Sequence, residues 1–157
     1  MKKTLIWLIG MPGCGKTTIG RELAAKIGKS FIDSDEYFTG RYDMTPEKCI
    51  NSLGESDFRS MEARALTELS FMTDAVIACG GGVVELEQNY STLKNSGIVI
   101  YIKRDLESLP IKGRPISAKL GVEQIYEKRH VLYETWCDRS VTNDDIKECV
   151  SSLAATL

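Results

Sequence analysis

Eight consecutive residues near the N-terminus combine the residue types that hold phosphate groups. Gly10 to Thr17 reads Gly-Met-Pro-Gly-Cys-Gly-Lys-Thr and matches the pattern G-x-x-x-x-G-K-[ST]. In such a loop, backbone N–H groups converge on one anion, and the N-terminus of the next helix adds its positive end. Lys16 would reach the β- and γ-phosphates, and the Thr17 hydroxyl would bind Mg²⁺. The pattern predicts a nucleoside triphosphate site, which we take to be for ATP, formed by Gly13, Cys14, Gly15, Lys16, Thr17 and Thr18.

Two carboxylates follow the next apolar run, in Asp33-Ser34-Asp35. In an extended segment, residues two apart point to the same side and stand about 6.6 Å apart, so both carboxylates could face one cleft. One could hold a Mg²⁺-bound water, and the other could hold the hydroxyl group that receives a phosphoryl group. The alternative is a solvated turn at the end of a strand, and the tripeptide alone does not decide between them.

Arginines and glycines farther along the chain could hold an anionic acceptor. Arg59 and Glu62 lie three residues apart on a predicted helix, so Glu62 either pairs with Arg59 at the surface or orients it toward a ligand. Gly80 to Gly82 either let the backbone approach a ligand closely or form a flexible turn. Arg114 lies in a polar segment suited to a lid, and Arg129 lies on the helix after it. Taken alone, Arg114 and Arg129 are each typical of a solvated surface residue.

Short apolar runs alternate with longer amphipathic stretches, which predicts strands alternating with helices. Continuous runs of β-branched and other apolar residues are typical of strands that are buried on both faces. Because parallel strands need long crossovers, this order favours a parallel sheet with helices on both faces and ligands beyond the carboxyl ends of the strands. The predicted strands are 5–9, 31–33, 75–78 and 98–102; helices are predicted from 19 to 27, from Thr45-Pro46 to Gly54, over 58–69, and after Thr142-Asn-Asp-Asp145.

Composition limits the classes of protein that fit. The chain has 157 residues, of which 43% are hydrophobic, which is enough for one domain with its own core. A net charge of −2 gives no basic surplus for nucleic acid, and the longest apolar run, Leu5 to Ile9, is too short to cross a membrane. The five cysteines include no C-x-x-C pair, which favours reduced thiols over a disulfide framework or a zinc site.

Taken together, the motifs resemble those of the shikimate kinase family, in the same order over nearly the whole chain. The family pattern is a phosphate loop, DxD, FRxxE, GGG, an RP-containing lid and RxxLY. The phosphate loop alone is shared by many families, so the ordered occurrence of the other five makes the resemblance specific. They stand here as Asp33-Ser-Asp35, Phe58-Arg-Ser-Met-Glu62, Gly80 to Gly82, Arg114-Pro115 and Arg129-His-Val-Leu-Tyr133.

The resemblance implies a role for each matching residue. Asp35 would hold and deprotonate the acceptor hydroxyl. Arg59 and Arg129 would clamp the shikimate carboxylate beside Gly80, Gly81 and Gly82, which suits the bidentate geometry of guanidinium groups. Lys16 and Arg114 would neutralise the transferring phosphoryl group, with Arg114 also contacting ATP. Mg²⁺ would be bound by Thr17 and, through water, by Asp33.

The resemblance also implies the fold and the setting. The expected fold is α/β, a three-layer αβα sandwich with a parallel five-stranded sheet, like that of nucleoside monophosphate kinases. It would form one domain over 1–157, with a substrate-binding segment over about 33–62 and a short lid over about 105–121. The expected activity is ATP-dependent phosphorylation of the 3-hydroxyl of shikimate in aromatic amino-acid biosynthesis. A cytoplasmic monomer that binds neither nucleic acid nor membrane is expected.

The chain departs from the family pattern in its lid. The family usually has further arginines before the Arg-Pro pair, one of them contacting adenine, whereas Asp105 to Gly113 contains none. We therefore expect weak ATP binding and tolerance of GTP, because no cation would stack on the base.

Two other functions remain open from the sequence. Another small-molecule kinase of this architecture, such as a gluconate or nucleoside monophosphate kinase, would not need a carboxylate clamp. An idle nucleotide-binding module that regulates a partner would explain the short lid, but it would not need Asp35, Lys16 and Arg114 together. ATP consumption that depends on shikimate would discriminate among these functions.

Overall fold

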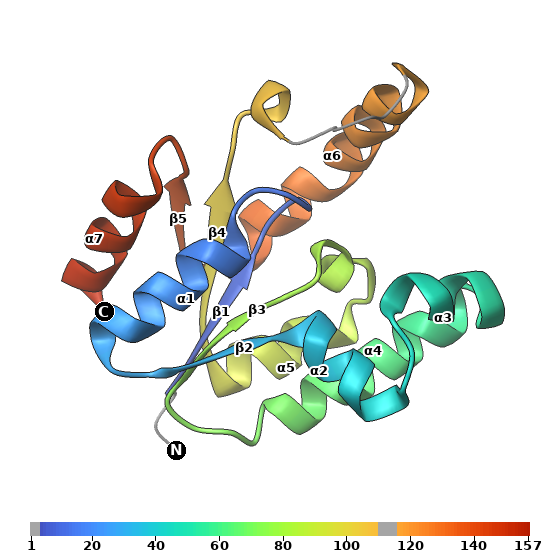
Figure 1. Ribbon diagram of the computed structural model, residues 1–157, viewed down its shortest axis with the longest axis horizontal. Coiled ribbons are helices and arrows are strands. Elements are labelled where there is room, and N and C mark those ends of the chain that lie inside the picture. The colour runs from blue at the N-terminus through green and yellow to red at the C-terminus, as the bar shows by residue number, and fades with distance from the viewer. Residues whose placement is uncertain (1–3, 110–115) are drawn as a thin grey trace.

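Five parallel strands form one sheet at the centre of the molecule (Figure 1). The computed structural model describes residues 4–109 and 116–157, with the backbone alone for residues 116–120. Their order in the sheet is β2-β3-β1-β4-β5, so β1 is central. The strands are β1 (Leu5–Ile9), β2 (Ser30–Asp33), β3 (Ala75–Ala78), β4 (Gly97–Lys103) and β5 (Arg139–Thr142).

Helices cover both faces of this sheet. Helices α1 and α7 pack together on one face, whereas α5 and α6 contact β4 from the other (Figure 1). Helices α2, α3 and α4 pack against one another beside the sheet. The expected three-layer α/β fold with a parallel five-stranded sheet is confirmed. The helices are α1 (Lys16–Ile27), α2 (Ser34–Tyr42), α3 (Pro46–Leu53), α4 (Glu55–Leu69), α5 (Gln88–Ser96), α6 (Ile116–Trp136) and α7 (Ile146–Thr156), with 3₁₀ turns η1 (Gly81–Glu85) and η2 (Leu106–Ser108).

The core is built on the strands whose apolar runs predicted them. All five residues of β1 are buried, and so are all four of β3. Trp7 is fully buried, and its indole N–H donates a hydrogen bond of 3.0 Å to Ser96 Oγ. Burial of a large aromatic side chain with a satisfied polar atom stabilises the central strand against α5. Because all the strands pair in parallel, their carboxyl ends lie at one edge of the sheet.

Several helix boundaries lie where capping residues predicted them. Gly28 adopts a left-handed conformation (φ 73°) after α1. The Thr45 hydroxyl accepts a hydrogen bond from the Lys48 amide ahead of α3, and the Asp145 carboxylate accepts one from the Glu148 amide ahead of α7.

Helices α2 and α5 and strand β5 were not among the elements predicted from their residues. Helix α2 starts directly after β2, so Asp33-Ser34-Asp35 is not extended and the expected same-side spacing of its carboxylates is wrong. Asp33 caps α2 by accepting hydrogen bonds from the amides of Asp35 and Glu36. Strand β5 has no buried residue, and its sequence, Arg-Ser-Val-Thr, lacks the apolar run of a central strand. Such a polar edge strand gives little periodic signal.

The expected lid over 105–121 is described only in part. Its first residues form η2, and α6 begins at Ile116. Arg114 lies outside the described residues. Among the described helices, none is both long and apolar enough to cross a membrane.

Candidate active site

The phosphate loop lies at the carboxyl end of β1 and leads into α1, as its pattern predicted (Figure 1). Gly13 and Gly15 adopt positive φ angles of 81° and 104°, which glycine adopts without strain. A Cβ atom at Gly15 would lie 2.5 Å from Asn143 Nδ2, and that amide donates a hydrogen bond of 2.9 Å to the Cys14 carbonyl. Asn143, which precedes α7, therefore stabilises the conformation of the phosphate loop.

The Lys16 side chain folds back onto the phosphate loop and contacts its backbone. Only 8% of the residue is exposed, and its ammonium group donates hydrogen bonds to the carbonyls of Gly10 (2.8 Å) and Met11 (2.9 Å). The Cys14 thiol, 3.6 Å from the same ammonium group, is buried on the core side of the loop. The loop therefore holds a positive charge at its centre before any phosphate binds.

Asp33 contacts both the end of the phosphate loop and the start of α2. Its Oδ2 accepts a hydrogen bond of 3.1 Å from the Thr17 hydroxyl, while its Oδ1 caps α2. A hydroxyl and a carboxylate oxygen in contact are ligand types that suit Mg²⁺, which prefers oxygen and retains several waters. Among the described residues, no group of three or more His, Cys, Asp or Glu could enclose a metal ion.

Asp35 lies in the first turn of α2 and faces the glycines after β3. A Cβ atom at Gly80 would lie 2.8 Å from Asp35 Oδ1 and 3.4 Å from Glu62 Oε2. The residue keeps an exposed surface, but protein packs around the rest of its carboxylate. This partial burial, followed by the charge of Asp33, raises the pKa of Asp35, although Lys16 and Arg59 oppose the shift. A raised pKa makes the carboxylate a better proton acceptor.

Arg59 packs directly on the glycine segment. A Cβ atom at Gly82 would collide with its guanidinium group, so a larger residue there would displace Arg59 from this position. Arg59 Nη1 lies 3.1 Å from Glu62 Oε1, and Nη2 lies 3.5 Å from Glu55 Oε1. Burial raises the pKa of Glu62, while the charge of Arg59 and its hydrogen bond oppose that shift. Of the two interpretations of this i, i+3 pair, orientation of Arg59 fits better than a solvated surface pair.

Arg129 approaches the same glycines from α6. Its side chain is 11% exposed, and its Nη2 lies 3.5 Å from Oε2 of Glu85, at the end of η1. Tyr133, one turn farther along α6, donates a hydrogen bond of 2.5 Å to the Gly81 carbonyl. Within the described part of the chain, the Nε atoms of Arg59 and Arg129 are buried without a hydrogen-bond partner. Two guanidinium groups therefore retain donors, as a site for an anion would require.

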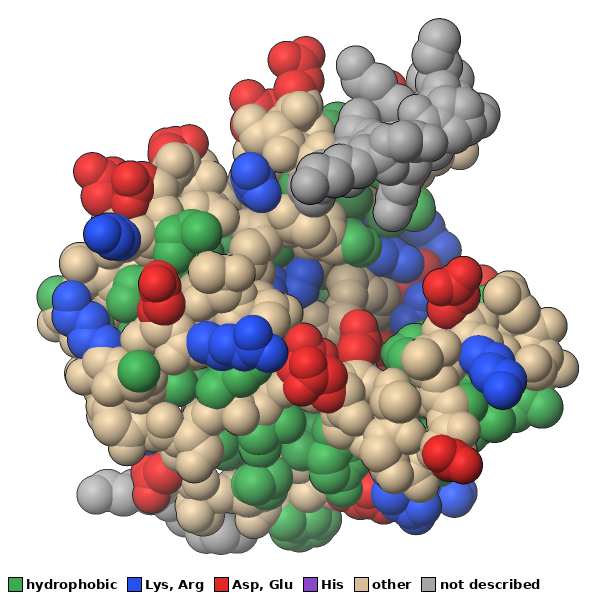
Figure 2. All heavy atoms as spheres, in the orientation of Figure 1, with side chains coloured by type: hydrophobic (Ala, Val, Ile, Leu, Met, Phe, Trp, Pro, Cys, Tyr) green, Lys and Arg blue, Asp and Glu red, His purple; other side chains and the backbone are tan. Residues whose placement is uncertain are grey.

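The surface is hollowed between the α2–α4 side of the molecule and the rest of this face (Figure 2). Figure 2 shows basic and acidic side chains gathered there, within an otherwise mixed surface. A Cβ atom at Gly81 would lie 2.7 Å from Pro12 of the phosphate loop, so an acceptor held beside the glycines would lie near the end of a bound triphosphate.

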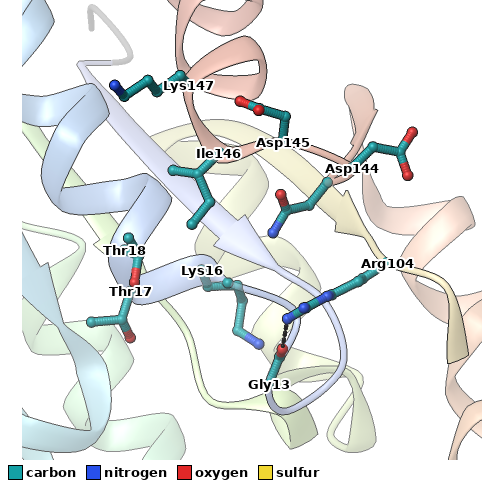
Figure 3. Close-up of a pocket in the computed structure, with 11 residues that line it drawn as sticks. Gly13, Lys16, Thr17, Thr18, Arg104, Asp144, Asp145, Ile146 and Lys147 are labelled. Atoms are coloured by element: carbon teal, nitrogen blue, oxygen red, sulfur yellow. Dashed lines mark hydrogen bonds between the residues drawn. The ribbon is translucent and has the colours of Figure 1, made fainter. Parts of the chain in front are cut away.

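A second cavity, of about 780 Å³, opens on the other side of the phosphate loop (Figure 3). Its volume is in the range of nucleotide-sized sites. Arg104 crosses its mouth from the end of β4 and donates a hydrogen bond of 3.0 Å to the Gly13 carbonyl (Figure 3). The lining residues are Gly13, Gly15, Lys16, Thr17, Thr18, Arg104, Asn143, Asp144, Asp145, Ile146 and Lys147.

A family model described as shikimate kinase matches residues 12–157 of this chain. The chain belongs to the shikimate kinase family. A shikimate kinase of Clostridium botulinum is 39% identical over 149 residues, which cover 90% of this chain and 89% of that protein. One from Psychrobacter is 33% identical over 156 residues, which cover 92% of this chain and 87% of that protein. The predicted family is confirmed.

Solved shikimate kinases also share the fold. The enzyme of Acinetobacter baumannii, in complex with shikimate, superimposes with a TM-score of 0.90 and 27% identity, covering 98% of this chain and 92% of that one. The enzyme of Bacteroides thetaiotaomicron gives a TM-score of 0.89 at 27% identity, covering 98% and 97% of the two chains.

The fold brings most of the predicted site residues to one edge of the sheet. Asp35, Arg59 and Arg129 surround the glycine segment 80–82, and Lys16 lies at the phosphate loop beside them. Thr17 and Thr18 line the cavity of about 780 Å³, but Cys14 does not. Its thiol is buried, and its amide donates to the Met11 carbonyl, so it contacts the loop itself.

Sequence reasoning missed three residues of the site. Arg104 follows β4 directly and so reaches the same sheet edge as the phosphate loop, a position that could have been recognised. The expectation of weak ATP binding and tolerance of GTP stays a prediction. It rests on the segment from Asp105 to Gly113, and Arg104, which lines the cavity, directly precedes that segment. Asn143 and Glu85 gave no signal, since only the fold shows that they contact Cys14 and Arg129.

Proposed function

We propose that this protein transfers the γ-phosphoryl group of ATP to the 3-hydroxyl of shikimate, giving shikimate 3-phosphate and ADP. The observation that carries the proposal is the pair Arg59 and Arg129, each with a buried donor free, beside Asp35 at the mouth of the phosphate loop. The family resemblance assigns the reaction to aromatic amino-acid biosynthesis. We propose that the protein works in the cytoplasm as a monomer and one domain, without nucleic acid or membrane.

In this mechanism Asp35 takes the proton from the 3-hydroxyl as the oxygen attacks the γ-phosphorus and the bond to ADP breaks. Lys16 neutralises charge on the transferring group. We assign the same task to Arg114, which rests on the Arg114-Pro115 motif because this residue lies outside the described part. The substrate-binding segment would be about 33–62 and the lid about 105–121.

The nucleotide would lie along the phosphate loop, contacting Gly13, Gly15 and Thr18, with Cys14 contributing only to the shape of the loop. Thr17, and Asp33 through water, would hold Mg²⁺. When bound, the ion neutralises charge on the phosphate oxygens. The contact between the Thr17 hydroxyl and Asp33 supports this assignment, since both supply oxygen ligands.

Removing either carboxylate-binding arginine should weaken shikimate binding. A charge-assisted hydrogen bond contributes roughly 1.5–3 kcal/mol. Arg129→Ala and Arg59→Ala should therefore each raise the KM for shikimate about ten- to a hundredfold, with little change in the KM for ATP. Steady-state kinetics with each substrate varied separately measures this. Equal shifts in both KM values would indicate general disruption of the cleft instead.

Arg104 should contribute to nucleotide binding. A guanidinium group that contacts a nucleotide base contributes about 0.5–2 kcal/mol, so Arg104→Gln should raise the KM for ATP about two- to thirtyfold. The KM for shikimate should stay within twofold. A matched control is Arg139→Gln, at the start of β5, which hydrogen-bonds the Thr156 carbonyl away from this cavity. An unchanged KM for ATP in Arg104→Gln would remove Arg104 from the nucleotide site.

A panel of acceptors tests the choice of substrate. ADP release from ATP would be followed with shikimate, gluconate, nucleoside monophosphates and a shikimate analogue whose carboxylate is reduced to an alcohol. Shikimate should be preferred strongly, and the reduced analogue should be a very poor substrate because both guanidinium groups would face a neutral oxygen. Equal rates with shikimate and the reduced analogue would contradict a carboxylate clamp.

A further inference from the structure

Glu85 is a buried carboxylate in contact with an arginine that we assign to substrate binding. Its side chain is 11% exposed, and its Oε2 lies 3.5 Å from Arg129 Nη2 and 3.2 Å from the Lys128 ammonium group. Burial alone would raise the pKa of Glu85, but Lys128 and Arg129 outweigh it and hold that pKa below its usual value. Glu85 is therefore ionised at neutral pH and lies beside the anion site.

The surroundings of the three glutamates in this cluster differ. Glu62 hydrogen-bonds Arg59 at 3.1 Å and is part of the family pattern. Glu55 lies 3.5 Å from Arg59, but its side chain is 64% exposed, so water screens its charge. Glu85 lies at the same separation from Arg129 with little solvent around it. A charge in that position acts strongly on any neighbouring anion.

We propose that Glu85 is the counter-ion of Arg129 in the empty site and that it lowers the affinity of the site for carboxylate-bearing acceptors. This inference rests on the proposed function, in which Arg129 binds the shikimate carboxylate. A buried guanidinium group needs a counter-ion when no substrate is bound, and Glu85 supplies it. Once shikimate binds, two carboxylates share one guanidinium group, and their repulsion opposes binding.

The arrangement has two linked consequences. Glu85 stabilises the empty enzyme, because Arg129 would otherwise be buried beside an unfilled anion site. It also weakens the binding of substrate and product through their carboxylates, so that both can dissociate from the site. The neighbouring Lys128, 69% exposed, offsets part of the negative charge and so reduces the size of the effect.

The test is to measure shikimate binding and thermal stability in Glu85→Gln, which removes the charge but keeps the shape. We expect the Kd for shikimate to fall about three- to tenfold by calorimetry, and the Tm of the empty variant to fall. The shift in Tm on adding shikimate should increase. Affinity for the carboxylate-reduced analogue should stay within twofold. A merely structural role for Glu85 would lower stability without tightening binding of the acid.

Two further variants keep the inference testable if Glu85→Gln folds poorly. Glu55→Gln removes a carboxylate that lies 3.5 Å from Arg59. Because water screens the charge of Glu55, the Kd for shikimate should change by less than twofold. Lys128→Gln changes an exposed residue and removes a positive charge beside Glu85. The negative charge of Glu85 is then less neutralised, so the Kd for shikimate should rise about twofold. An unchanged or raised Kd in Glu85→Gln, or an unchanged or lowered Kd in Lys128→Gln, would overturn the inference. Failure of the wild-type protein to bind shikimate would instead overturn the proposed function.

Discussion

Replacing Lys16 with methionine should abolish phosphoryl transfer while the protein stays folded. The ammonium group donates hydrogen bonds to two carbonyls of the phosphate loop, and the residue as a whole is only 8% exposed, so water has little access to the site of the lost charge. Removing one preorganised charge from a site of this kind costs about 10²–10³-fold in kcat or more. Methionine has a similar length and fills the same volume. Steady-state assays should therefore show a loss of at least this size, with an unchanged far-UV circular dichroism spectrum.

A matched control is Lys26→Met, on the same helix but exposed near its end. Its hydrogen bond to Ser151 is at the surface, so activity should change by less than twofold. Retention of more than a tenth of the activity in Lys16→Met would contradict the role given to this residue.

Asp35→Asn should lower kcat by about 10²-fold or more and should raise the thermal stability. The amide can still contact the acceptor hydroxyl but cannot accept its proton, and loss of a general base has an effect of this order. The stability rises because burial, and then Asp33, raise the pKa of Asp35, so its charged form is costly in the folded protein. A fall in Tm would contradict this account of the carboxylate.

The same pKa shift predicts a pH dependence with a definite sign. For an acid whose pKa is raised in the folded protein, the stabilisation is present at low pH and is lost as pH rises through the raised value. Activity requires the ionised form, so it should fall as pH decreases through that same value. The acidic limb of kcat/KM should therefore lie above the usual pKa of aspartate, as pH–rate profiles would show.

Asp33→Asn is the informative comparison for Asp35. Asparagine caps a helix about as well as aspartate, so α2 should keep its start. The lost carboxylate charge should instead raise the concentration of Mg²⁺ needed for half-maximal activity. Equal, mild effects of both substitutions would mean that the roles of the pair are misassigned.

Local patterns predicted most of the elements that position the site. The apolar runs of β1, β3 and β4 reflect burial on both faces of a sheet, and a single stretch of sequence shows this. The glycines and Lys16 predicted the loop because their conformational and charge requirements are local. Capping residues such as Thr45 and Asp145 did the same for the starts of α3 and α7.

Features that depend on distant contacts could not be predicted in the same way. Asn143 supports the loop across 129 residues of sequence, and no local pattern indicates that pairing. Helix α2 buries only Ser34 and Phe38, too few apolar positions to show a helical period, so the sequence does not distinguish its first turn from an extended segment. Strand β5 is an edge strand with polar residues. In each case the tertiary structure, rather than local preference, determines the conformation.

The central claim is that this protein phosphorylates shikimate, and direct detection of the product tests it most simply. The protein would be mixed with MgATP and shikimate, and the products followed by phosphorus NMR and mass spectrometry. We predict a new phosphate monoester on the 3-hydroxyl of shikimate, formed in equal amount with ADP and absent when shikimate or the protein is omitted. Consumption of ATP without a shikimate ester, or no reaction at all with the folded protein, would contradict the account.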